Sequence, residues 1–296
     1  MRFGRATLSG ALLGLASACT PAPALPPGGA LPARLSEVGL YDDLRARSVT
    51  DDARPYSPRY PLWSDGVEKR RWLDLPPGGE IDRSDPDRWQ FPVGTRAYKE
   101  FSLGPRPLET RVMWRVADTG RREDDTLFGT YVWQEDGADA RHAVDGVPDV
   151  LGTSHDVPSR EACWLCHLGE SGHVLGVSAL QLDEPEAASP TLDPAIGYLH
   201  GNCGHCHNPR GRAWSDTDLV LRIGADGDTR ALVASVLAPM MTVPNGGPRV
   251  RAGAPEHSPL LERAAQRGTK EQMPPLGSER VDEAAIEVLR RWIRGL

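Results

Sequence analysis

Two copies of one five-residue pattern constrain this chain more than any other feature. CWLCH at residues 163–167 and CGHCH at residues 203–207 each place two thiols three positions apart, with a histidine directly after the second. The chain of 296 residues has only one other cysteine, Cys19. Each pattern therefore favours a fold in which two thiols and one imidazole can bind the same group.

The spacing has a direct chemical meaning. Two thiols on one turn can each add to a vinyl group of a single haem, and the histidine that follows then presents its imidazole to the iron. The sequence therefore predicts two covalently bound haem c groups. The predicted thioether sites and proximal iron ligands are Cys163, Cys166 and His167 for the first haem, and Cys203, Cys206 and His207 for the second.

Two other kinds of site also use paired cysteines. A four-cysteine zinc site would account for the C-x-x-C pairs but not for a histidine after both of them. Cys-Gly-His-Cys also occurs in disulfide isomerases, where the motif follows a buried strand and begins a long helix. Here residues 193–202 (DPAIGYLHGN) precede the motif and indicate a short helix. Haem attachment is therefore the preferred interpretation of both motifs.

An electron-transferring haem usually needs a sixth iron ligand, and a methionine thioether raises the potential. Met273 begins Met-Pro-Pro-Leu-Gly, an extended loop fixed by two prolines, which could hold the sulfur over a ring face. It is the predicted distal ligand of the second haem. For the first haem, His155 is the preferred candidate, ahead of His173 and of an iron left open. Further candidates are Met113, Met240 and Met241, whereas His142, His200, His205 and His257 are interpreted as non-ligands.

His205 stands between two cysteines of the second motif, and we expect its side chain to face solvent.

The N-terminus has the features of an export signal. Two arginines precede an apolar stretch at 6–18, which is too short to cross a bilayer, and Cys19 follows Ala-Ser-Ala. Ordinary cleavage after Ala18 would leave a free thiol, so a lipobox with the lipid on Cys19 is preferred. Residues 1–19 are thus the predicted signal peptide and 20–35 a flexible linker. We expect a periplasmic protein that a lipid anchors to the cell envelope, at the outer membrane.

The predicted fold class is α+β with several domains. Residues 36–157 form a β-rich, sandwich-like domain, because 110–116 alternates in period two and 127–134 is a second strong strand. Residues 158–190 form the first haem-binding segment, and 191–296 an α-helical domain with the second haem. Weaker strands are expected at 95–103 and 69–75, and helices at 258–268 and 283–294, the latter after an Asp282 N-cap.

The order of elements in 191–296 resembles a class I cytochrome c domain. A short helix, C-x-x-C-H, Met-Pro-Pro and a terminal helix ending in Trp-Ile carry the resemblance. It implies that Cys203 and Cys206 hold the haem, with His207 as proximal and Met273 as distal ligand. Residues 214–248 depart from the compact family pattern and indicate an insertion.

From Tyr60 onward, the chain also resembles a bacterial family of exported di-haem cytochromes of poorly defined role. Its matching segments are PLWSDG (61–66), PVGT (92–95), the Pro-Ser before the first motif, and MPPLG (273–277).

Charge and composition favour an electron carrier. Lys+Arg 34 against Asp+Glu 41 gives a net charge of −7, which argues against nucleic-acid binding. We expect a protein that passes single electrons between transient redox partners, rather than a catalyst of its own reaction. The alternatives are a di-haem peroxidase or oxidase with an open first iron and, less favoured, a thiol–disulfide oxidoreductase.

Overall fold

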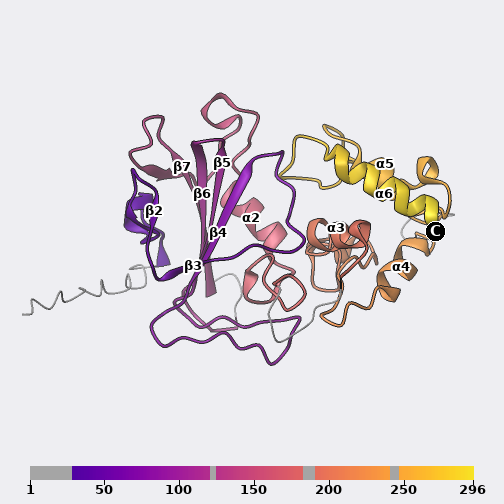
Figure 1. Cartoon of the computed structure of the whole chain (residues 1–296), viewed down its shortest axis with the longest axis horizontal. Helices are drawn as coiled ribbons and strands as arrows, with labels where there is room; N and C mark the ends of the chain where they lie inside the picture. The colour runs from indigo at the N-terminus through magenta and orange to yellow at the C-terminus, as the bar shows by residue number, and fades with distance from the viewer. Residues whose placement is uncertain (1–28, 121–124, 183–190, 241–246) are drawn as a thin grey trace, which may run out of the picture.

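A computed structural model describes residues 29–120, 125–182, 191–240 and 247–296. The strands of the first half of the chain form a sheet lobe, and the last third forms a helical lobe beside it (Figure 1). Cys19 and Met241 lie outside the described residues. No helix within the described ranges is long and apolar enough to cross a membrane.

The sheet lobe is built on six antiparallel strands that follow one another in sequence order. All four predicted strands are confirmed, and their ends differ from the prediction by a few residues. The strands are β3 (Ala53–Pro55), β4 (Glu68–Asp74), β5 (Arg96–Leu103), β6 (Arg106–Arg115), β7 (Thr126–Trp133) and β8 (Ala140–His142). A separate two-stranded sheet joins β1 (Tyr41–Asp43) to β2 (Ser48–Val49).

One face of the large sheet carries the aromatic core that the alternation predicts. Val112 and Trp114 of β6 lie on this face with Tyr131 and Trp133 of β7. The second layer of the expected sandwich is small: residues 35–49, including β1 and β2, cover this face.

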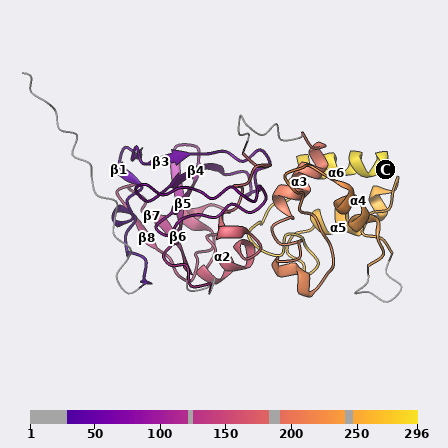
Figure 2. The ribbon, with the colours of Figure 1, turned by 90° about the horizontal axis from the view of Figure 1, so that it is seen from below.

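The opposite face of the sheet packs against α2 (Arg160–His167). Ser159 begins this helix by accepting a hydrogen bond from the Ala162 backbone N–H, which satisfies a donor left free at the helix start. Figures 1 and 2 both show α2 between the strands and the helical lobe. The first cysteine motif is therefore placed where the two lobes meet.

The helical lobe contains α3 (Pro194–Asn202), α4 (Arg230–Leu237), α5 (Pro259–Ala264) and α6 (Glu283–Gly295). Asp282 caps α6 as predicted, and the apolar stripe of α6, including Leu289 and Ile293, is buried. The predicted helix at 258–268 ends early, at Ala264. The Arg263 carbonyl accepts a hydrogen bond from Met273 N, so the chain folds back instead of continuing the helix. The segment expected to be an insertion contains α4, whose Leu232 joins the core.

Candidate functional site

The first motif occupies the C-terminal part of α2. Cys163 is 8% exposed and packs in an apolar cluster with Met113 and Phe128 from the facing strands. Cys166, one turn further on, is half-buried. The two sulfurs are thus presented on one helical turn, with His167 at its end, as the spacing predicts.

The hydrogen bonds of His167 fix its tautomer. Its Nδ1 lies 2.6 Å from the carbonyl oxygen of His173, and because a carbonyl only accepts, Nδ1 carries the proton and donates. Burial and the nearby charge of Lys99 hold the pKa of His167 well below its usual value, so the ring is neutral. Its Nε2 therefore offers a lone pair, as an iron-binding imidazole requires.

A cavity beside the first motif is lined by two of the candidate sixth ligands. Met113 and His173 line this cavity together with Cys163 and His167. The preferred candidate, His155, is buried, and its Nε2 donates to Glu109 Oε1 at 2.7 Å. His155 Nδ1 makes no hydrogen bond to any described residue. The assignment of His155 as ligand stays a prediction.

The second motif begins where α3 ends. Cys203 follows Asn202, and the backbone N–H groups of Cys206 and His207 both donate to the Cys203 carbonyl, at 3.1 and 2.9 Å. This turn gathers the two cysteines and the histidine closely. Burial lowers the pKa of His207 to about 4, so its imidazole is neutral, and its buried Nδ1 has no hydrogen-bond partner among the described residues.

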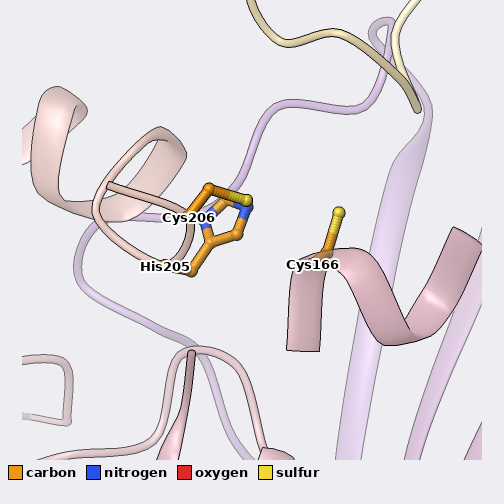
Figure 3. Close-up of side chains that lie close together, drawn as sticks. All are labelled: Cys166, His205 and Cys206. Carbon is orange, nitrogen blue, oxygen red and sulfur yellow. The ribbon is translucent and has the colours of Figure 1, made fainter. Parts of the chain in front are cut away.

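The two motifs face each other across the junction of the lobes. Ligand atoms of Cys166, His205 and Cys206 all lie within 4.8 Å of one another, with Cys166 on α2 and the other two on the turn after α3 (Figure 3). Hydrogen bonds from Cys206 and His205 hold the pKa of Cys166 well below its usual value. Sequence reasoning did not predict this meeting, because it depends on how the lobes pack.

The expectation that His205 faces solvent is wrong. Its side chain is 8% exposed and lies close to the sulfur of Cys166. The turn is covered by α2, an element 40 residues earlier in the chain, which the local sequence of the second motif cannot reveal.

The loop that carries Met273 is hydrogen-bonded to segment 61–66 mainly through the carboxylate of Asp65. Asp65 accepts hydrogen bonds from Ser278 Oγ at 2.9 Å, from Glu279 N at 3.1 Å and from Arg280 N at 2.9 Å. Segment 61–66 thus holds the residues that follow Met-Pro-Pro-Leu-Gly. The sequence shows both segments but not their contact. Met273 itself is half-buried.

The donor set of each motif fits a covalently attached haem. All four motif cysteines are free thiols, and each motif ends in a neutral, half-buried histidine. A sulfur that forms a thioether is not available to a metal ion at Cys166, His205 and Cys206. Haem at both motifs and a metal ion between them therefore exclude each other.

No protein-family model, curated protein or solved structure matches this chain. The fold and the site define it only broadly: a mixed α/β protein in which a six-stranded antiparallel sheet and a set of helices meet at two C-x-x-C-H motifs.

Proposed function

We propose that this protein is an exported di-haem c-type cytochrome that transfers electrons in the cell envelope. The observation that carries the proposal is the pair of C-x-x-C-H motifs, each with both thiols free and a neutral histidine at its end. His167 supports it most directly, because its Nδ1–H is held by a backbone carbonyl and its Nε2 is left for a metal.

The haem groups would supply one-electron redox chemistry at iron. In this proposal Cys163 and Cys166 hold the first haem, and His167 is its proximal ligand. Phe128 packs its ring against His167 at 4.9 Å between centroids and so restrains the imidazole. The cavity lining favours Met113 and His173 as residues near the sixth position, while His155 remains a third candidate.

For the second haem, we propose Cys203 and Cys206 as thioether sites, His207 as proximal ligand and Met273 as distal ligand. The helical lobe would then be a domain of the class I cytochrome c type. Two features support this: α3 leads directly into the motif, and the terminal helix α6 packs against α3. The loop of Met273 is anchored through Asp65, which limits its freedom to move away.

Lipidation at Cys19, the periplasmic location at the outer membrane and the transient redox partners belong to the same proposal. They rest on the sequence alone, because the N-terminal segment lies outside the described residues.

One observation favours a second candidate. Two sulfurs and one imidazole lie within 4.8 Å of one another, and the pKa of Cys166 is held low, which suits a thiolate ligand of Zn²⁺ or a redox-active thiol. On this alternative, Cys163 and Cys203 would have no role at the metal.

Absorption spectra and metal content separate the two candidates. The protein is produced in a host that matures c-type cytochromes and purified without added metal. Di-haem attachment predicts Soret and α bands that sharpen on reduction, iron near two per chain and little zinc. A colourless protein with zinc near one per chain would overturn the proposal in favour of the metal site.

A further inference from the structure

Three cations stand in one row on the face of the sheet that α2 covers. Arg71 of β4 is directly opposite Lys99 of β5, and Lys99 is directly opposite Arg111 of β6. Residues paired across antiparallel strands project to the same side of a sheet, and like charges placed opposite one another are destabilising. We call Arg71, Lys99 and Arg111 the cation row.

The row is only partly neutralised by the protein. Glu109 is fully buried and binds Arg111 through two hydrogen bonds, of 3.0 and 2.5 Å. Arg71 is 8% exposed, and neither it nor Lys99 makes a side-chain hydrogen bond or ion pair with any residue that the structure describes. Burial beside the two arginines lowers the pKa of Lys99 to about 7. Against the single carboxylate of Glu109, the row therefore keeps an excess of one positive charge when Lys99 is neutral and of two when Lys99 is protonated.

A bound anion would offset the cost of this unpaired charge and would favour the protonated form of Lys99. Space for one is present. Lys99 lines two neighbouring cavities: one also contains Arg71, and the other contains Arg111, Cys163 and His167.

A charged pair that also lines the first cavity, Arg222 and Glu170, does not cancel this excess of positive charge. Arg222 is bound by Glu170, so the two compensate each other. His200 in the same cavity is neutral, since burial lowers its pKa to about 3.

Next to the cation row, the same face of the sheet carries an apolar row. Its members are paired across β4 to β7 in the register Leu73–Ala97–Met113–Phe128. They pack in one cluster with Cys163. A ligand seated here meets apolar side chains along one part and two unpaired cations along its edge.

We propose that the cation row binds a pair of carboxylates belonging to a ligand with an apolar body. Two sources supply that chemistry: the propionates of a haem on Cys163 and Cys166, or a free dicarboxylate. The first source rests on the proposed function, and the second does not.

Substitutions that remove one charge test the row in the purified holoprotein. Arg71→Met and Lys99→Met each delete a cation with little change in length, and Lys99→Arg keeps the charge. Lys270→Met removes a charge at an exposed position and serves as the matched control. The midpoint potentials of both haems are measured, and the first haem is assigned by its loss in a Cys163→Ala/Cys166→Ala variant.

If propionates are the ligand, Arg71→Met and Lys99→Met both lower the potential of the first haem, because a lost cation favours the ferric state. Lys99→Arg, Lys270→Met and the second haem keep their potentials.

If a free dicarboxylate is the ligand, calorimetric titration with succinate shows saturable binding to the wild type. Arg71→Met and Lys99→Met then each lower the affinity for succinate by about tenfold or more, because each variant loses a charge-assisted hydrogen bond to a carboxylate. Unchanged potentials together with no succinate binding, or binding that the variants leave unaltered, overturn the proposal. A protein without haem would refute the proposed function alone. The succinate titration would then still show whether the cation row binds carboxylates.

Discussion

At the scale of single residues, the site depends on two half-buried imidazoles, of His167 and His207, that stay neutral. His167 donates from Nδ1 to a carbonyl, and His207 has a buried Nδ1 without a partner among the described residues. A ring in either state keeps one nitrogen free for a metal. Haem attachment would thus use side chains whose protonation is already set by the fold.

Met273→Ala is expected to change only the second haem. Loss of the thioether ligand should abolish the low-spin His/Met spectrum of that haem and lower its potential, since methionine ligation raises it. The first haem should keep its spectrum. Leu276→Ala, in the same Met-Pro-Pro-Leu-Gly loop, is the matched control, and optical redox titration is the measurement. Unaltered spectra in Met273→Ala would remove Met273 from the ligand set.

His200 is expected to make the fold sensitive to acid. Its Nδ1 accepts a hydrogen bond from Ile223 N at 3.0 Å, and burial, with Arg222 and His205 nearby, lowers its pKa to about 3. The unfolded chain binds a proton near pH 6.5 and the folded chain does not. The contribution of His200 is therefore complete above about pH 6.5 and is lost as the pH falls toward 3.

His200→Gln keeps an acceptor for Ile223 but cannot titrate. Between pH 6 and 4, the free energy of unfolding of the wild type should fall relative to this variant by up to about 1.4 kcal/mol per pH unit. Denaturant titration at several pH values measures the difference. His257→Gln, at an exposed position, should follow the wild type. Parallel curves for wild type and His200→Gln would contradict the assignment.

At the scale of elements, the contact between segment 61–66 and segment 278–280 joins the two lobes. Asp65 is buried, and its carboxylate receives three hydrogen bonds, two of them from backbone N–H groups. Trp63 adds a bond from Nε1 to the Arg280 carbonyl at 3.1 Å. The Asp65 carboxylate and the Trp63 indole therefore both link segment 61–66 to the loop after Met273.

Asp65→Ala should cost about 1–3 kcal/mol of unfolding free energy, because the partly buried N–H groups of Glu279 and Arg280 lose their acceptor. Chemical denaturation measures this. The control is Asp136→Ala, since Asp136 accepts a backbone hydrogen bond in an exposed turn, where water can replace it. Equal stability of the two variants would show that the Asp65 hydrogen bonds do not stabilise the contact with segment 278–280.

The elements that could be predicted from the sequence are those set by local pattern. Alternation in β6 and the Asp282 cap of α6 are local signals, and both are confirmed. The cation row could not be predicted, because Arg71, Lys99 and Arg111 come together only through the register of three strands. The scarcity of lysine was one indication of a special role for these positions: the chain has three lysines, and two of them, Lys69 and Lys99, lie in this sheet.

At the scale of the whole molecule, the junction of the lobes brings Cys166 within reach of Cys206. Motifs this close would allow two haem groups to exchange electrons over a short path. The contact could not be predicted, because no local pattern encodes lobe packing.

The overall charge predicts the kind of partner. The chain carries −7, and haem propionates would add negative charge, so a basic redox protein is the better match. We expect the bimolecular rate of electron exchange with a small basic cytochrome to fall as salt is raised, because screening weakens the steering. Stopped-flow absorbance measures the rate, with an acidic acceptor as control. A rate for the basic partner that rises with salt would contradict this charge match.

The proposed function requires that each motif hold one haem covalently. The most direct test is the mass of the denatured polypeptide after expression with c-type maturation. Di-haem attachment predicts a gain of two haem masses in the wild type and of one in each motif's double variant, Cys163→Ala/Cys166→Ala or Cys203→Ala/Cys206→Ala. A wild-type polypeptide at the mass of the bare chain would contradict it.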